Sequence, residues 1–171
     1  MLTLIRHTKP QVETGLCYGQ SDLSLALSYP KELEQIRANL STKPHSQIYS
    51  SPLKRCTILT QDLFSNFKCD ARLMEMNFGD WELKKWDDIN DNYAQKWYQD
   101  YINTPCPNGE SFIEMQHRVL EFYNEKIKSQ KKDTIIVCHG GVIRLFLNII
   151  QNIPLSKVFD IKIDYGAILY L

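Results

Sequence analysis

The sequence predicts an α/β fold, a three-layer sandwich built around a mainly parallel central sheet. Short apolar runs of strand length alternate along the chain with longer segments whose apolar residues recur at helical spacing. Helical crossovers between such strands make neighbouring strands parallel and cover both faces of the sheet. At 171 residues the chain has the size of one domain, so we expect a single domain over residues 1–171.

Three runs have the character of buried strands. They are residues 2–5, 47–49 and 134–138, and each contains β-branched or aromatic side chains. The first and last are almost wholly apolar, as strands covered on both faces are. The tail, residues 158–171, is predicted to form a β-hairpin that turns near Asp164, Tyr165 and Gly166.

Two helices are expected between the first and the third of these predicted strands. Residues 29–40 have an apolar face, and Pro30 stands near the first helical position, where its missing N–H is no loss. Residues 52–67 follow Ser50 and Ser51, whose hydroxyl groups can cap a helix.

Three more segments have helical patterns. Residues 84–102 place aromatic residues at helical spacing, which indicates a core face or a pocket wall. Residues 111–128 have an apolar face, and residues 142–150 are apolar all round, which predicts a buried helix. We expect residues 76–112 to form part of a lid over a pocket.

The composition excludes several classes of protein. The chain has 20 basic and 20 acidic residues, which argues against the basic surface of nucleic-acid-binding or membrane-surface proteins. No apolar run approaches the roughly 20 residues of a membrane span, and no charged leader precedes residues 2–5. We therefore expect a cytoplasmic protein with neither a nucleic-acid nor a membrane partner, and the sequence leaves the oligomeric state open.

Residues suited to phosphate binding follow each of the three predicted strands. They are Arg6 and His7 after the first, Ser50, Ser51 and Arg55 after the second, and His139, Gly140 and Gly141 after the third. In open α/β sheets, ligands bind at the carboxyl ends of the strands, where helix N-termini also present free N–H groups to an anion. Clustered positive charge of this kind indicates a site for a polyanion, and guanidinium groups match the oxygens of phosphate.

This pattern predicts metal-independent phosphoryl transfer with His7 as the nucleophile. Neutral imidazole attacks phosphorus, and water can then hydrolyse the labile phosphoramidate. Arg6, Arg55 and a protonated His139 are expected to stabilise the charged oxygens, while Gly140 lets the backbone approach the substrate. No metal or other cofactor is expected, since His45 and His117 are isolated and have no paired acids beside them.

The leaving alkoxide also needs a proton donor. Glu75 is the best candidate, because apolar neighbours could desolvate it and favour its protonated form. Glu82 is the alternative acid.

Five segments together resemble the histidine phosphatase superfamily, which has the fold of the cofactor-dependent phosphoglycerate mutases. They are residues 4–8 (LIRHT), 50–57 (SSPLKRCT), 73–82 (LMEMNFGDWE), 107–111 (PNGES) and 137–141 (VCHGG). The resemblance implies a phosphoglycerate mutase-like fold and phosphorylation of His7. It also implies phosphoryl binding by Arg6, Arg55 and His139, acid–base catalysis by Glu75, and a pocket bordered by Glu110 and Ser111.

Within the superfamily, residues 6–10 (RHTKP) and 17–22 (CYGQSD) resemble the α-ribazole phosphatases, which act on α-ribazole 5′-phosphate in assembly of the cobalamin nucleotide loop. The chain departs from the common pattern at Thr8 and Leu83, where glycine is usual, although the α-ribazole branch shares the threonine. A small phosphate ester is the expected partner. A phosphoglycerate mutase-type enzyme, a broad-specificity metabolite phosphatase and an inactive phosphate- or partner-binding domain remain alternatives.

Overall fold

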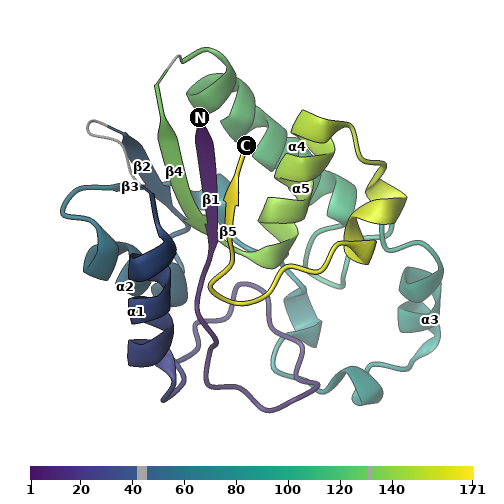
Figure 1. Cartoon of the computed structure of the whole chain (residues 1–171). Coiled ribbons are helices and arrows are strands. Elements are labelled where there is room, and N and C mark those ends of the chain that lie inside the picture. The colour runs from purple at the N-terminus through teal and green to yellow at the C-terminus, as the bar shows by residue number, and fades with distance from the viewer. Residues whose placement is uncertain (42–45, 131) are drawn as a thin grey trace.

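The computed structural model describes residues 1–41, 46–130 and 132–171. Within them, five strands form one sheet in the order β3-β2-β4-β1-β5, in which β5 runs antiparallel to β1 and the other pairings are parallel (Figure 1). The α/β architecture and the mainly parallel sheet are therefore confirmed. The strands are β1 (Leu2–Arg6), β2 (Gln47–Ser50), β3 (Lys68–Cys69), β4 (Thr134–Cys138) and β5 (Ile168–Tyr170).

Helices cover both faces of this sheet, so the molecule has three layers (Figure 1). On one face, Ile5 and Val137 pack with α1 (Tyr29–Asn39) and α2 (Lys54–Leu63). The alternate residues, including Ile136, point to the other face and pack with α4 (Phe112–Phe122) and α5 (Gly140–Gln151). This alternation follows from the two-residue period of a strand.

The helix starts are set by local sequence. Pro30 lies in the first turn of α1, as predicted. Ser111 and Glu114 form a capping box at the start of α4, in which each side chain accepts a hydrogen bond from the other residue's backbone N–H. α4 ends at Phe122, and a π-helical segment, Tyr123–Lys128, follows it directly. The predicted helical segment 111–128 is therefore confirmed from Phe112 to Lys128, with Ser111 as its cap. None of the described helices is long and apolar enough to cross a bilayer.

The helix predicted for residues 52–67 is wrong at both ends. α2 begins only at Lys54, and no side chain caps it. Ser51 instead places its hydroxyl 2.7 Å from His139 Nε2. The helix ends at Leu63 because Phe64 adopts an extended conformation, from which the chain leads into β3.

The single helix predicted within residues 84–102 is also wrong. A 3₁₀ turn, Trp86–Asp88, is followed by a separate helix, α3 (Asn92–Gln99). Asp91 has an extended conformation and its carboxylate accepts a hydrogen bond from the Ala94 N–H, which caps α3 and prevents a continuous helix. The aromatic residues still gather, and the rings of Trp86 and Trp97 stack with their centroids 5.9 Å apart.

The predicted C-terminal hairpin does not form. The 3₁₀ helix Leu155–Asp160 runs into its start, and only Ile168–Tyr170, near its end, form a strand, β5. The chain does turn near Asp164, where the Ala167 N–H donates to the Asp164 carbonyl at 3.1 Å. β5 pairs with β1 rather than with a neighbouring segment of the tail, with Thr3 opposite Tyr170. The pairing satisfies backbone groups of β1 that would otherwise lie at an open edge of the sheet.

Candidate active site

The pairing of β1 with β4 brings His7 and His139 together. Arg6 is in register with Cys138, and the His7 N–H donates to the Cys138 carbonyl at 3.0 Å. Because the strands are parallel, both histidines follow at the same edge of the sheet. Their ring centroids lie 5.0 Å apart in an edge-to-face arrangement.

Arg55 reaches the same edge from the first turn of α2. β2 is the other neighbour of β4, and the Ser51 N–H donates to the Val137 carbonyl at 3.0 Å. The Arg55 side chain is fully buried, and its charge helps lower the pKa of both His7 and His139. The strand ends therefore bring together the two histidines and Arg55, as the sequence predicts.

A cavity of about 390 Å³, a size typical of small-molecule sites, is lined by His7. Arg55 and His139 are fully buried and are not among the residues that line it. Arg6, His7 and Glu75 form part of its polar wall. Most of its other lining residues are apolar or aromatic. Residues within the predicted lid segment 76–112 supply some of these, namely Met76, Phe78, Trp86 and Phe112.

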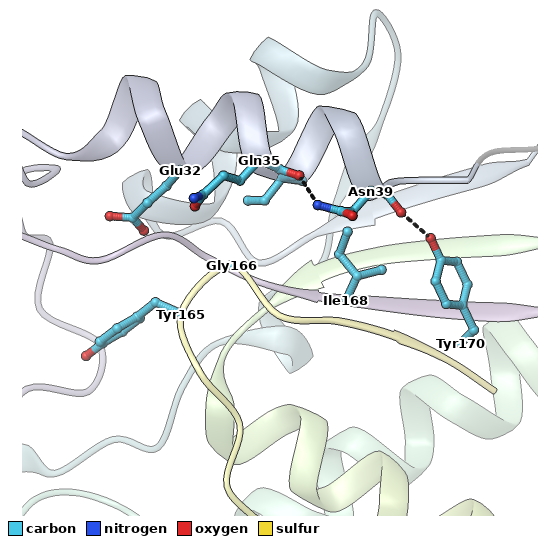
Figure 2. A pocket seen from close by; sticks show the side chains of 8 residues that line it. Glu32, Gln35, Asn39, Tyr165, Gly166, Ile168 and Tyr170 are labelled. Carbon is cyan, nitrogen blue, oxygen red and sulfur yellow. Dashed lines mark hydrogen bonds between the residues drawn. The ribbon is translucent and has the colours of Figure 1, made fainter.

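A second cavity of about 440 Å³ lies between α1 and the chain that leads into β5 (Figure 2). Glu32, Gln35 and Asn39 of α1 line it from one side, and Ile168 and Tyr170 line it from the other. Its lining contains a carboxylate and no lysine, arginine or histidine. It therefore does not suit a phosphate ester, although it is the larger of the two.

His7 is held in a defined tautomer. Its Nδ1 lies 2.7 Å from the Thr8 carbonyl oxygen, which can only accept, so Nδ1 carries the hydrogen and Nε2 keeps its lone pair. Burial is the main cause that lowers the pKa of His7 well below 6.5, and the charges of Arg55 and Arg6 lower it further. His7 is therefore neutral at pH 7.

His139 corrects one sequence-based expectation. Burial, His7 and Arg55 together lower its pKa well below 6.5, so the surrounding protein favours neutral imidazole rather than the protonated form that we expected. Burying a cation between other cations is unfavourable, which explains the direction. A phosphate dianion in the site would oppose this effect by adding negative charge beside the ring.

Glu75 lies at the N-terminus of α5. Its carboxylate accepts hydrogen bonds from the Gly141 and Met76 N–H groups, both at 3.1 Å. Its surroundings are thus more polar than its apolar sequence neighbours suggest. A Cβ atom on Gly141 would lie 2.3 Å from Glu75 Oε1, so this glycine leaves room for the carboxylate. At Gly140, a Cβ atom would approach the side chains of Arg144 and Arg6 instead.

The alternative acid, Glu82, is placed differently. It does not line the cavity, and its carboxylate accepts hydrogen bonds from the N–H groups of Gln20, Ser21 and Phe78. Geometry therefore favours Glu75 as the proton donor.

Glu110 holds the chain segment around Glu75 in place through an ion pair with Arg118. Its two carboxylate oxygens accept from Arg118 at 2.7 and 3.0 Å, and Glu110 also accepts from the Asn77 N–H. Arg118 donates in turn to the carbonyl oxygen of Glu75 at 3.0 Å. The pair fixes the backbone around Glu75.

Cys56 lies close to the site, with its Sγ 3.5 Å from His139 Nε2. Burial raises the pKa of this thiol, which therefore stays protonated and is a poor nucleophile. The described residues contain no group of three or more His, Cys, Asp or Glu side chains arranged to hold a metal ion. His45 lies outside the described residues.

Two residues of the site were not predicted from the sequence. Arg144 lines the cavity from α5 and donates to the Ile161 carbonyl, and no described carboxylate forms an ion pair with it. Its position one turn after Gly140 is a signal that could have identified it. Tyr165 packs against His7 and lies under the Arg6 guanidinium, 3.9 Å from the Arg6 Cζ to the ring centroid. No local pattern indicates the role of Tyr165.

Several buried polar atoms at the site lack a hydrogen-bond partner among the described residues. Buried donors are rarely left without an acceptor in native proteins. An oxyanion bound between the guanidinium groups would supply acceptors to them. The atoms are Nε of Arg6, Nε of Arg55, Nε of Arg144 and Oγ1 of Thr8.

Known proteins share this fold. The α-ribazole phosphatase from Shigella flexneri superposes with a TM-score of 0.88 at 24% identity, over 98% of this chain and 87% of the other. Among curated sequences, a Hydrogenobacter thermophilus protein provisionally named phosphoserine phosphatase 2 is 29% identical, over 98% of this chain and 86% of its own length. The adenosylcobalamin/α-ribazole phosphatase of Salmonella typhimurium is 24% identical, over 97% of this chain and 87% of its own length.

A family profile covers almost the whole sequence. The profile of the histidine phosphatase superfamily (branch 1) matches residues 2–171, which include all five motifs quoted above. The fold of the solved relatives agrees with this match. The chain therefore belongs to branch 1 of the histidine phosphatase superfamily, as a phosphatase or mutase.

Proposed function

We propose that this chain hydrolyses phosphate monoesters through a phosphohistidine formed on His7. The observation that carries the proposal is the 2.7 Å hydrogen bond between His7 Nδ1 and the Thr8 carbonyl. It leaves the Nε2 lone pair available to attack phosphorus, in an imidazole that is neutral at pH 7. The Nε2–P bond forms as the ester P–O bond breaks. Water then cleaves the N–P bond to release inorganic phosphate and free His7.

Charge stabilisation falls to Arg6, Arg55 and His139. Each guanidinium group has a buried Nε without a described partner. Fixed cations in a water-poor site stabilise the negative charge of the transferring phosphoryl group strongly. The backbone around Gly140 completes the proposed binding site.

Glu75 is the proposed acid and base. It lines the same cavity as His7, and its carboxylate is held by the Gly141 N–H at the start of α5. In the first step it gives a proton to the departing alkoxide, and in the second it takes one from the attacking water. This double use returns Glu75 to its starting state.

The proposed substrate is α-ribazole 5′-phosphate. The apolar wall of the cavity carries Phe78, Trp86 and Phe112, which could stack on an aromatic base. The relative from Salmonella typhimurium is named for this substrate, and residues 6–10 and 17–22 resemble the same branch. Polar and aromatic side chains line the same cavity, which supports a substrate that carries both a phosphate and a ring system.

Arg144 favours a second candidate, a small phosphorylated amino acid or hydroxy acid. It supplies a cation beyond those assigned to the phosphoryl group, and a carboxylate is its natural partner. The relative from Hydrogenobacter thermophilus carries the name of a phosphoserine phosphatase.

Turnover of p-nitrophenyl phosphate in EDTA tests the proposed chemistry. We expect phosphate release that survives the chelator and is inhibited by vanadate. A protein that binds phosphate and shows no turnover would be an inactive binding domain instead. Activity lost in EDTA and restored by a divalent ion would indicate metal-assisted hydrolysis.

Comparison of kcat/KM over α-ribazole 5′-phosphate, phosphoserine and 3-phosphoglycerate tests the substrate. We expect the first to be the best, and mutase activity above phosphatase activity would overturn the assignment. Phosphoserine and phosphoethanolamine differ only by a carboxylate and form a matched pair for Arg144. If the second candidate is correct, Arg144→Leu should lower kcat/KM for phosphoserine selectively.

A further inference from the structure

Arg55 is a buried cation without a direct counter-ion. Its side chain is fully buried, and no described carboxylate lies within ion-pair distance of it. Its two terminal nitrogens instead donate to the carbonyls of Gly19 and Ser21, at 2.5 and 2.9 Å. Burial of an uncompensated charge is costly, so something must stabilise the guanidinium where it stands.

Glu82 holds the other side of the same loop. Its Oε1 accepts from the Gln20 N–H at 2.8 Å, and its Oε2 accepts from the Ser21 N–H at 2.6 Å and from the Ser21 hydroxyl. Oε1 also accepts from the Phe78 N–H at 3.2 Å. The carboxylate therefore faces the N–H groups of the loop whose carbonyls face Arg55.

The two charges are joined through a single peptide group. The Gly19 carbonyl and the Gln20 N–H belong to the same peptide bond, which accepts from Arg55 Nη2 at one end and donates to Glu82 Oε1 at the other. A carboxylate that accepts from the N–H end pushes electron density through the amide toward the carbonyl oxygen, which strengthens the hydrogen bond that this oxygen accepts. The loop has little freedom to shift, because a Cβ atom on Gly19 would lie only 1.8 Å from the Met76 carbonyl oxygen.

We propose that Glu82 is the positioning residue for Arg55, acting through the Gly19–Gln20 peptide to orient the guanidinium for the phosphoryl group. Glu82 does not touch the substrate. Its carboxylate turns the loop carbonyls toward Arg55 and supplies negative charge one peptide away. Arg55 Nε, which has no described partner, is left for the substrate. The inference rests on the proposed role of Arg55 in phosphate binding.

Calorimetric titration with orthovanadate and with inorganic phosphate tests this inference without requiring turnover. We expect Glu82→Gln to raise the Kd of both anions by about tenfold, within the range of coupling found between members of one hydrogen-bond network. Asp80→Asn is the matched control, because it also removes one negative charge, only two positions from Glu82. Asp80 is exposed and accepts a hydrogen bond from Asn108. The Asp80→Asn variant should leave both Kd values unchanged.

A double-mutant cycle shows whether Glu82 acts through Arg55. Arg55→Lys keeps the positive charge but cannot reproduce the two hydrogen bonds that the guanidinium donates to the Gly19 and Ser21 carbonyls. In the Arg55→Lys background, Glu82→Gln should therefore weaken anion binding by less than about twofold. Equal effects of Glu82→Gln in both backgrounds, or a lower Tm with unchanged Kd in Glu82→Gln alone, would show that Glu82 only joins two loops.

Failure of the inference differs from failure of the proposed function. A wild-type protein that binds neither anion overturns both. A wild-type protein that binds, with a Glu82→Gln variant that binds equally well, overturns the inference alone. If Glu82→Gln does not fold, Glu82→Asp repeats the test, because its carboxylate is drawn back by one methylene group. The Glu82→Asp variant should also raise the Kd of both anions, and unchanged Kd values would refute the inference.

Discussion

The imidazole rings of His7 and His139 meet edge to face, with centroids 5.0 Å apart, and the charge of Arg55 acts on both. Burial lowers the pKa of each ring, and Arg55 and Arg6 lower both further. Two neighbouring imidazoles are therefore neutral at a pH at which an ordinary histidine is partly charged. This arrangement gives His7 the form that attacks phosphorus over a wide range of pH.

Proton NMR should detect this neutrality directly. The imidazole C2–H resonances of His7 and His139 should remain in their neutral positions as the pH falls through 6.5, the ordinary value for histidine. The same resonances in urea-unfolded protein serve as the reference and should titrate normally. Titration of both rings near 6.5 in the folded protein would contradict the lowered pKa values of His7 and His139.

The same pKa shifts make stability depend on pH. Below about 6.5 the unfolded chain takes up protons that the buried histidines of the folded protein do not, so the free energy of unfolding should fall as the pH decreases. The contribution is complete above 6.5. Tm measured between pH 7.5 and 5 should show the decline, and His139→Asn should show a shallower one. Parallel declines would assign the effect to other groups.

His7→Ala should abolish turnover and leave the fold intact, because phosphoryl transfer loses its nucleophile. Brief exposure of the wild type to labelled substrate should leave an acid-labile, base-stable label on His7, as expected for a phosphoramidate. His117→Ala, at an exposed position outside the cavity, is the control and should retain both label and activity. Label that persists in His7→Ala would place the nucleophile elsewhere.

Glu75→Gln should affect substrates according to their leaving groups. A sugar alkoxide needs a proton to depart, so its first-turnover burst should slow by roughly 10²–10⁴-fold, the usual contribution of general acid catalysis. Nitrophenolate departs unaided and should lose far less. Rapid mixing isolates the phosphorylation step, in which the water-activating role of Glu75 does not interfere. Equal losses for both substrates would restrict Glu75 to a structural role.

Gly141→Ala should reproduce part of that effect without altering the carboxylate. The new Cβ atom would lie 2.3 Å from Glu75 Oε1, so the side chain of Glu75 must move away from the start of α5. We expect a larger loss of kcat for a sugar phosphate than for p-nitrophenyl phosphate. Circular dichroism would check that the helix is intact, since alanine is a better helix former than glycine. Unchanged kinetics would mean that the contact between Gly141 and Glu75 is dispensable.

Leu83→Gly should stabilise the protein. Leu83 has a φ of +66°, in the left-handed region that costs a residue with a Cβ atom roughly 1–2 kcal/mol. Leu83 is 57% exposed, so little burial is lost. Glycine makes the unfolded chain more flexible at a cost of about 0.4–1 kcal/mol, so we expect a net gain of about 0.5 kcal/mol in the free energy of unfolding. Urea denaturation measures the change. Leu27→Gly is the control, because Leu27 is 96% exposed and lacks positive φ, and it should not be stabilising.

The sequence by itself determined which residues lie at the ends of the strands. The runs that became β1 and β4 are continuous and apolar, and Arg6, His7 and His139 follow them directly along the chain. Parallel strands end at one edge of a sheet, so recognition of two such strands predicts that His7 and His139 lie at the same edge. They meet because β1 and β4 are neighbours in the sheet, which the tertiary structure decided. The capping residues of α4 and the proline of α1 are equally local signals.

The tertiary structure decided which other side chains contact the residues of the site. β5 completes the sheet beside β1 instead of forming a hairpin. Glu82 meets the loop at Gln20, and Tyr165 reaches His7, through contacts between segments far apart in the chain. Periodicity and capping report on the nearest few residues only. Contacts between distant segments depend on how the chain returns to the sheet, and no local pattern encodes that path.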